Sequence, residues 1–236
     1  MTRNVTESLA YALIASFTAV TMLVVSFLAV EPTISHGQDA TSNQFTIRQT
    51  ITDENSFKVV ADVVMAGDIN GVTGGNATGT TQFVVVTNNA AGYTVEIDFD
   101  YTGGNVESMV GDESDGEEIR DYDGEVGGEP SFAFTASTAA QFGYTVTSST
   151  TNDVDQSFLS NAGLCNVSAG GGGTEEADAC WKAPQNSGFQ IIDTSDAAAN
   201  GATSTLKFKV HVPNSAVPVP LAETYTATAT LSLFNK

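Results

Sequence analysis

The chain has 236 residues and a formal net charge of −20, because 28 aspartates and glutamates face only 8 lysines and arginines. A chain this acidic repels phosphate backbones, which argues against nucleic acid as a partner. Charged residues make up only 15% of the chain, and threonine, valine and phenylalanine recur in alternating segments, a composition that favours strands over helices.

An uncharged run opens the chain. Residues 9–30 (LAYALIASFTAVTMLVVSFLAV) are long enough to span a bilayer as a helix, and Arg3 weakly favours an N-terminus inside the cell. We therefore assign residues 1–30 to a signal or anchor helix and residues 31–43 to a polar stalk. The remainder is expected outside the cell, either anchored in the membrane through this helix or secreted after its cleavage.

The first alternating segment follows the stalk. In residues 44–52, Phe45, Ile47 and Ile51 fall on one face, which predicts a strand. Because this strand would follow a flexible stalk, it could be donated to the sheet edge of a neighbouring molecule. Residues 56–65 are more continuously apolar and predict a strand covered on both faces.

Glycines dominate residues 66–79, so a long turn is expected there, before a strand at residues 81–87. Residues 93–101 then alternate without a break, with large apolar side chains on one face and threonine or acids on the other. A helix would scatter those apolar side chains around its circumference, so the pattern predicts a strand.

Residues 103–130 form a long acidic insertion. Within it, Asp121, Asp123 and Glu125 place three carboxylates at alternate positions, and such hard oxygen ligands suit Ca²⁺. The twelve-residue helix-flanked calcium loop is not matched. Two readings stay open: a calcium site, or a solvated acidic loop that binds no cofactor.

Residues 131–137 and 142–149 predict two further strands, and residues 150–188 are mostly loop. This loop contains Cys165 and Cys180, the two cysteines of the chain. An even pair in an exported chain favours a disulfide, with two free buried thiols as the alternative. Trp181 is expected either in the core against that disulfide or on the surface as an adhesive aromatic.

Asn76 and Asn166 each begin an N-x-S/T acceptor pattern for N-glycosylation, and both fall in glycine-rich segments that we interpret as turns. Further on, residues 189–193 suggest a short strand, and residues 203–212 and 224–234 alternate clearly. Lys207 and Lys209 lie on the outward face of the former, where they could protect a sheet edge.

About nine strands follow from these segments. With turn signals between them, they predict an all-β fold over residues 44–236, specifically an antiparallel immunoglobulin-like β-sandwich preceded by one apolar helix. The acidic insertion 103–130 and the disulfide loop 165–180 would be excursions from this sandwich.

Several segments together carry a resemblance. GGNATGT runs into VVVTNNAAGYTVEI, CWKA follows the glycine-rich loop, and ATSTLKFKVHVPNSAVPVPLAETYTATATLSL ends the chain. As a set, over residues 56–101 and 180–236, these resemble a loose group of uncharacterised, surface-exported sandwich proteins of small-genome, uncultivated bacteria. The resemblance implies an exported immunoglobulin-like fold and no settled activity.

Catalysis finds little support in the sequence. The nucleophile turn G-x-S-x-G, the zinc motif H-E-x-x-H and the phosphate-loop lysine are missing, and His211 sits at an outward strand position. The sequence therefore favours a structural or adhesive cell-surface protein that is not an enzyme. Two alternatives stay open: a subunit of a pilus-like filament of copies of itself, assembled by strand donation, and a surface calcium-binding module.

Overall fold

A computed structural model describes most of the chain, which divides into two units, Met1–Thr50 and Ile51–Lys236. The described residues are 15–19, 21–22, 48–59, 63–67, 69–101, 106–114, 116–134, 138–149 and 153–236.

In the first unit, residues 15–19 and 21–22 are helical. The rest of the expected helix 1–30, the stalk 31–43, and the residues Phe45 and Ile47 lie outside the described residues. Within the part of the chain that is described, no helix is both long enough and apolar enough to cross a membrane.

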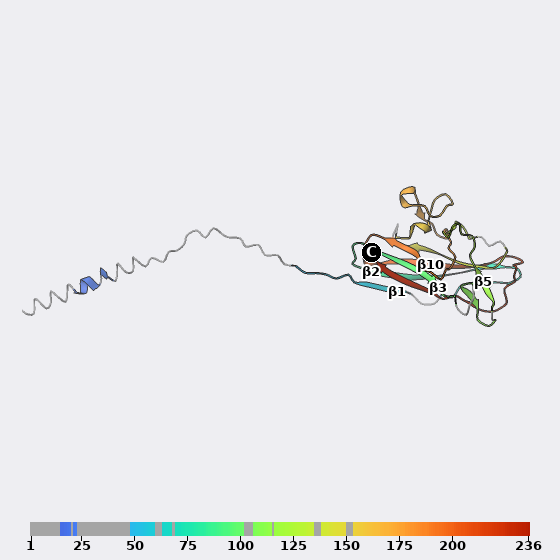
Figure 1. Ribbon diagram of the computed structural model, residues 1–236, viewed down its shortest axis with the longest axis horizontal. Helices are drawn as coiled ribbons and strands as arrows, with labels where there is room; N and C mark the ends of the chain where they lie inside the picture. The colour runs from blue at the N-terminus through green and yellow to red at the C-terminus, as the bar shows by residue number, and fades with distance from the viewer. Residues whose placement is uncertain are drawn as a thin grey trace, which may run out of the picture. The chain divides into compact units, whose positions relative to one another are not determined.

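The regular secondary structure described in the second unit is almost entirely strand, which confirms the all-β class (Figure 1). Its described residues form the strands β1 (Asn55–Val59), β2 (Gly75–Thr87), β3 (Tyr93–Phe99), β4 (Met109–Gly111), β5 (Glu118–Asp121), β6 (Gln141–Ser148), β7 (Leu159–Ser160), β8 (Thr174–Glu175), β9 (Phe189–Thr194), β10 (Ala198–Val212), β11 (Tyr225–Thr226) and β12 (Ala229–Asn235), and the short 3-10 helices η2 (Gln156–Phe158) and η3 (Ala169–Gly171).

These strands form three sheets. The largest has the order β1-β2-β10-β6-β5-β4-β11, a smaller one has the order β12-β3-β9, and β7 pairs with β8 alone. All pairs are antiparallel except β5 with β6, which run parallel. The described residues thus hold twelve strands where the sequence predicted about nine, and the large sheet is not purely antiparallel.

The main core joins the two larger sheets. Phe99 of β3 packs against β6, with ring centroids 6.1 Å from Phe142 and 5.4 Å from Tyr144. The inward faces of β2, β3, β6, β9 and β10 all contribute to the same apolar cluster. Burial of this surface is the main source of the fold's stability.

Strict alternation correctly predicted the faces of β3. Tyr93, Val95, Ile97 and Phe99 are buried, while the side chains between them are half-buried. A strand turns successive side chains to opposite faces, so this alternation places every large apolar residue on the core side.

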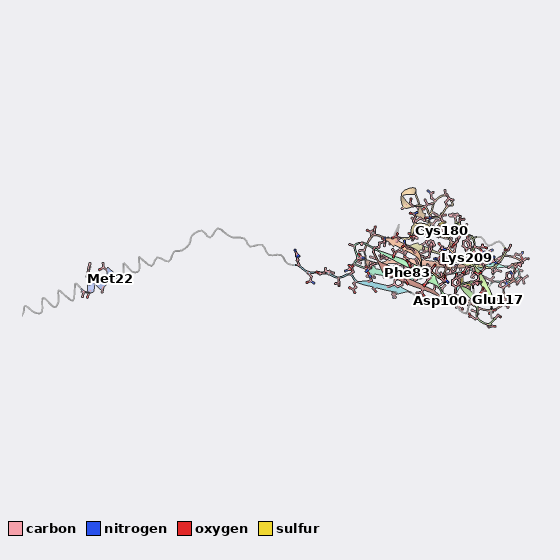
Figure 2. The ribbon with its side chains drawn as sticks, in the orientation of Figure 1. Met22, Phe83, Asp100, Glu117, Cys180 and Lys209 are labelled. Carbon is pink, nitrogen blue, oxygen red and sulfur yellow. A yellow bond between two sulfur atoms is a disulfide. The ribbon has the colours of Figure 1, made fainter. Side chains whose placement is uncertain are left out.

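For β10, the predicted alternation of inward and outward side chains is correct, but the predicted position at a sheet edge is not. Leu206, Val210 and Val212 face the core, yet β10 lies between β2 and β6 in the interior of the large sheet. The prediction that Lys207 and Lys209 protect a sheet edge is therefore wrong. Lys209 instead lies over two aromatic rings, 4.9 Å from the ring centre of Phe134 and 5.6 Å from that of Trp181 (Figure 2 labels Lys209).

The two strands predicted at residues 44–52 and 56–65 differ from the structure. Residues 48–54 lie in no strand, so the described part of the expected strand 44–52 is not paired. The strand predicted for residues 56–65 is β1, which forms an edge of the large sheet. Over residues 55–58 of β1, the side chains are exposed except that of Phe57, which is half-buried, so coverage on both faces is wrong for this part of the strand.

The acidic insertion 103–130 contributes to the sheet. Its strands β4 and β5 extend the large sheet beyond β6, and Ile119 of β5 joins the core. The described residues of the insertion are therefore not a purely solvated loop. Strands of three and four residues show too little alternation to be recognised in the sequence.

The last predicted strand, residues 224–234, is divided between two sheets. β11 pairs with β4 in the large sheet, and β12 pairs with β3 in the smaller one. Ala227 and Thr228 connect them without belonging to either strand. The chain thus crosses from one layer to the other at this point.

Candidate functional site

An apolar groove of about 1310 Å³ lies in the second unit, and we call it the β12 groove. Its walls come from both layers of the fold. The large sheet contributes Leu206 and Phe208 of β10, the smaller sheet contributes Ile97 and Phe99 of β3, and residues 220–231 run along it. The groove therefore opens directly onto side chains that belong to the core.

The inward face of β12 is incompletely covered. Ala229, Leu231 and Leu233 pair with Phe99, Ile97 and Val95, so their side chains point to the same side of the sheet as these core residues. Ile97 and Val95 are fully buried, whereas Leu231 and Leu233 are only half-buried and Ala229 is exposed. β12 has β3 on one side and no described strand on the other.

Small side chains on β2 widen the groove. Ala77 and Thr81 are the inward residues of β2 that line it, and Gly79 lies between them on the same face. Val63 and Met65 lie close against Gly79: a Cβ atom at Gly79 would be 2.4 Å from Cγ1 of Val63. The segment 63–65 therefore covers this part of β2 only because Gly79 has no side chain.

The carboxylates of Glu223 and Glu117 near the groove accept hydrogen bonds from neighbouring groups of the same molecule. Glu223 Oε2 accepts hydrogen bonds from the backbone N–H groups of Glu113 (2.8 Å) and Ser114 (3.1 Å), and these bonds lower the pKa of Glu223. The hydroxyl of Tyr225 donates to Glu117 Oε1 at 3.1 Å, and burial followed by this bond raises the pKa of Tyr225. Glu223 is the one charged residue among the described residues that line the groove.

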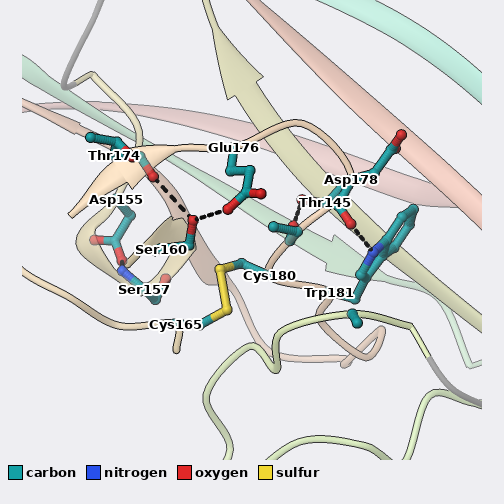
Figure 3. Close-up of a disulfide and its surroundings, with 12 residues drawn as sticks. Thr145, Asp155, Ser157, Ser160, Cys165, Thr174, Glu176, Asp178, Cys180 and Trp181 are labelled. Carbon is teal, nitrogen blue, oxygen red and sulfur yellow. Dashed lines mark hydrogen bonds between the residues drawn. A yellow bond between two sulfur atoms is a disulfide. The ribbon is translucent and has the colours of Figure 1, made fainter. Parts of the chain in front are cut away.

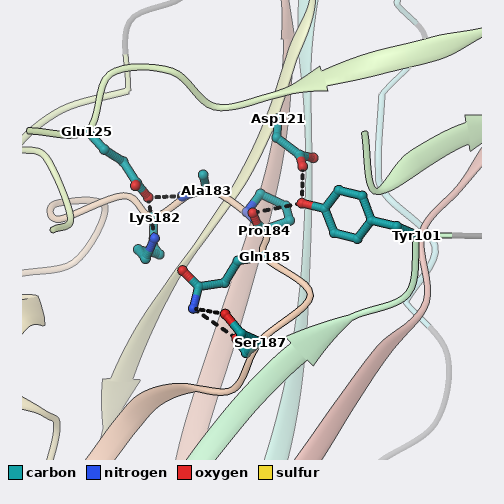
Figure 4. A network of polar contacts seen from close by, with 8 residues as sticks. All are labelled: Tyr101, Asp121, Glu125, Lys182, Ala183, Pro184, Gln185 and Ser187. Atoms are coloured by element: carbon teal, nitrogen blue, oxygen red, sulfur yellow. Dashed lines mark hydrogen bonds and ion pairs between the residues drawn. The ribbon is translucent and has the colours of Figure 1, made fainter. Parts of the chain in front are cut away.

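A second polar feature is buried away from the groove. The side chain of Lys182 is only 2% exposed, and its Nζ lies 2.7 Å from Oε1 of Glu125, whose side chain is 15% exposed (Figure 4). The same carboxylate oxygen accepts a hydrogen bond from the backbone N–H of Ala183 at 2.5 Å. Lys182 Nζ also lies 4.6 Å from the ring centre of Phe189.

The backbone of Lys182 fixes this position. Lys182 and Tyr144 exchange two backbone hydrogen bonds of 2.8 and 3.0 Å, so both side chains project to the same face. The hydroxyl of Tyr144 is fully buried and has no hydrogen-bond partner among the described residues. Burial raises the pKa of Tyr144 well above its ordinary value, and the charge of Glu125 adds to this effect.

The carboxylates predicted to bind calcium are directed to separate partners. Asp121 accepts hydrogen bonds from Tyr101 and Ser108, Asp123 lies 3.8 Å from Arg120 on the surface, and Glu125 binds Lys182. The structure does not bring the three together. No group of three or more histidines, cysteines, aspartates or glutamates suited to a metal ion occurs within the described ranges.

The contact between Tyr101 and Asp121 is shown in Figure 4. Burial raises the pKa of the Asp121 carboxyl, although hydrogen bonds from Ser108 and Tyr101 act in the opposite direction. Burial, followed by the hydrogen bond to Asp121, also raises the pKa of Tyr101. The pair holds the acidic insertion against the loop at Pro184, because the Tyr101 hydroxyl also lies 3.1 Å from the Pro184 carbonyl.

The predicted disulfide between Cys165 and Cys180 is confirmed, with their Cα atoms 5.6 Å apart (Figure 3). Its surroundings are well bonded: Thr145 Oγ1 donates to the carbonyl of Ala179 at 2.7 Å, and Trp181 Nε1 donates to the carbonyl of Asp178 at 2.9 Å. Trp181 is buried and packs edge-on against Phe134, so it is a core residue in a small cluster of its own.

The two glycosylation acceptors are both exposed, but they occupy different backbone settings. Asn76 lies within β2, not in a turn as predicted, and its Oδ1 is 2.6 Å from Nδ1 of His211. Burial and the nearby Lys209 lower the pKa of His211. Asn166 lies in the loop after β7, where its Oδ1 accepts a hydrogen bond from Gln156.

Of the residues predicted for strand donation, Ile51 is described and is 81% exposed. It belongs to no sheet of its own molecule. Phe45 and Ile47 lie outside the described residues.

Sequence reasoning missed the groove and Lys182. The alternating pattern of residues 224–234 shows which side chains face inward but not which strands lie beside them. The small inward residues of β2, Ala77 and Gly79, are the sequence signal that side chains leave space on this face of the strand. Lys182 follows Trp181 in a short loop, and its burial depends on a partner 57 residues away in the sequence.

No known protein family, no curated protein and no solved structure matches this chain. The expected kinship with exported sandwich proteins of uncultivated bacteria stays a prediction. The arguments for function therefore rest on the contacts described above.

Proposed function

We propose that this protein is a non-catalytic structural protein of the cell surface whose β12 groove receives an extended apolar segment as an additional strand. One observation carries the proposal: Ala229, Leu231 and Leu233 of β12 face the core side yet remain partly or wholly exposed. Apolar side chains in this position need a cover, and an added strand beside β12 would provide it.

Strand addition would satisfy both the unpaired backbone edge of β12 and the exposed apolar side chains of the groove. An unpaired sheet edge offers backbone N–H and C=O groups to a new strand, and these hydrogen bonds do not depend on the sequence of that strand. The apolar groove would then accept every second side chain of the same strand, which gives the binding its specificity.

The lining also supports assembly over bond-breaking chemistry. Most of the described lining residues are apolar, and the single carboxylate among them is held by backbone N–H groups. Such a surface stabilises apolar side chains and offers little for acid–base catalysis.

We further propose that the two layers form an immunoglobulin-like sandwich at the outer cell surface, held by the membrane helix or secreted. The shared core of the two larger sheets supports the sandwich. The disulfide supports an oxidising compartment, because such bonds persist outside the reducing cytosol. The net charge of −20 suits a solvent-exposed extracellular protein.

Site-specific photo-crosslinking tests the groove. A benzophenone amino acid would be placed at Leu231, which lines the groove, or at Ser232, which projects to the other face of β12 and does not line the groove. In cells that express the full chain, we expect crosslinks from position 231 to one defined extended segment, identified by mass spectrometry of the linked peptides.

The matched position 232 should give no crosslink to that segment. Equal crosslinking from both positions, or none from position 231, would remove the proposal of strand addition.

A further inference from the structure

We propose that the segment received by the β12 groove is residues 45–51 of a second copy of this chain. The inference rests on the proposed function, because it names the occupant of the same groove. It makes the protein a donor of one strand and an acceptor of another, so that copies can join in series.

The residue pattern of the segment matches the groove. Phe45, Ile47 and Ile51 share one face of an extended chain, and Gln49 is the polar exception on that face. The groove beside Ala229 and Leu231 is apolar and spacious enough for large side chains. A strand laid along β12 would therefore place its apolar face into the groove and its threonines and Arg48 outward.

The described part of the segment, residues 48–51, is unpaired in the sheets of its own molecule. The other strongly alternating segments of the sequence are already paired in β3, β10 and β12. By contrast, residues 48–52 lie in no strand and Ile51 is 81% exposed. Exposure of a large β-branched side chain costs free energy that burial in a partner would recover.

Charge also favours this segment. Between Asp39 and Asp53 the chain contains no acidic residue and one base, Arg48, whereas the whole chain carries 28 acids against 8 bases. Two acidic bodies repel each other, so the segment that approaches a second body most readily is the one without carboxylates.

The anchoring of the chain favours a second copy over the molecule's own segment. Asn88 accepts a hydrogen bond from the backbone N–H of Glu54 (2.7 Å) and donates one to the carbonyl of Thr52 (3.1 Å). Asn55 in turn contacts Asn235, the last residue of β12, at 2.6 Å. Residues 52–55 are thereby fixed at the end of the body where β12 finishes.

From this position, the molecule's own residues 45–51 could lie along β12 only in the parallel direction. The segment of a second copy can lie antiparallel, which is the slightly more stable pairing per residue. Ile51 directly precedes the anchored Thr52, so in such a pair the end of the donor body that carries Thr52 would lie beside Ala229 at the start of the acceptor's β12.

Cysteine pairing between two different full-length variants tests the inference. The native cysteines are already joined to each other and leave no free thiol. Full-length protein with Phe45→Cys would be mixed in detergent with full-length protein carrying Ala229→Cys, Leu231→Cys or Leu233→Cys, which covers the possible registers. We expect a disulfide-linked dimer whose linked peptides join position 45 to one of these positions.

Two matched controls use the outward faces of the same strands. Thr46→Cys in the donor and Ser232→Cys in the acceptor should each reduce the yield of the linked dimer severalfold. Equal yields from the controls would overturn the inference, because chance encounters would then explain the bond.

Two further outcomes separate the inference from the proposed function. If position 231 photo-crosslinks to a segment other than residues 45–51 and Phe45→Cys forms no disulfide with position 229, 231 or 233, strand addition stands and this occupant is wrong. If a chain carrying both Phe45→Cys and Leu231→Cys closes the bond within a monomer at every concentration, the occupant is the molecule's own segment and the second copy is wrong.

Discussion

Lys182 is the most unusual side chain of the body, because a lysine that is 2% exposed must find compensation for the water it loses. Glu125 provides the opposite charge, the N–H of Ala183 binds the same carboxylate oxygen, and the face of Phe189 lies against the ammonium. These contacts also join the acidic insertion to the loop that follows the disulfide. A buried pair of this kind is costly to break because the remaining charge has no partner.

Glu125→Gln should therefore lower the free energy of unfolding by about 3 kcal/mol, since it leaves the buried ammonium of Lys182 without a counter-charge. The change is measured by urea denaturation. Asp123→Asn is the matched control, because Asp123 lies on the surface and pairs with Arg120 at 3.8 Å. It should change stability little, since exposed ion pairs contribute little. Equal effects from both variants would show that the pair is not desolvated.

Gly79 is the second residue whose identity decides a local structure. Gly79→Val should displace Val63 and Met65 from β2 and destabilise the body by about 1–3 kcal/mol, because the added atoms overlap Val63. Thr80→Val, at the exposed neighbouring position, is the control and should be tolerated. Thermal unfolding of the two variants distinguishes them. If Gly79→Val has the same melting temperature as the wild type, the position of Val63 does not depend on the missing side chain at Gly79.

At the scale of elements, local alternation in the sequence predicted where the long strands lie and which of their side chains face inward. It did not predict the order of the strands within each sheet. β3 and β10 were recognised because five or more successive residues alternate, yet β10 was placed at an edge although it lies between β2 and β6. Two lysines on an outward face look the same on an edge strand as on a central one. The short strands β4 and β5 were missed because their acids and glycines resemble a loop. The groove could not be foreseen because it requires knowing that β3 is the single neighbour of β12 among the described strands.

The disulfide loop offers a prediction at this scale. Replacing both cysteines by serine should destabilise the body by about 3 kcal/mol, because the bond closes a loop of 15 residues. The loss should be localised: amide hydrogen exchange should rise in β7, β8 and η3 and much less in β2 and β3. Uniform loss of protection across the body would instead show that the bond supports the whole core.

At the scale of the whole molecule, burial of tyrosines couples folding to alkaline pH. Burial raises the pKa of Tyr93 to about 12, and it also raises the pKa values of Tyr101, Tyr144 and Tyr225. The folded state therefore holds these phenolic protons more tightly than the unfolded chain does. This contribution to stability is complete below about pH 10, the ordinary pKa of the phenol, and is lost as pH rises toward the folded values.

We expect the body to unfold cooperatively at a pH above 10, with tyrosinate absorbance at 295 nm appearing together with the loss of the strand signal in circular dichroism. Tyr93→Phe should move this transition to higher pH, because it removes one group that ionises on unfolding. If the absorbance rises gradually while the strand signal stays constant, the phenols are accessible in the folded state and the linkage is absent.

The places where the chain enters and leaves the body have a mechanical consequence. Thr52 is bound beside Asn88, and Lys236 is bound beside Asn89, so both lie at one end of the body (the C label in Figure 1 marks Lys236). Tension between these two points would pull β1 and β12 from the same end and open their hydrogen bonds one after another, like a zipper. A donated strand lying along β12 would carry a load along its axis, so its hydrogen bonds would resist together. In a series of such molecules, the contact between copies would therefore withstand a larger force than β1 and β12 of an isolated copy that is pulled at Thr52 and Lys236.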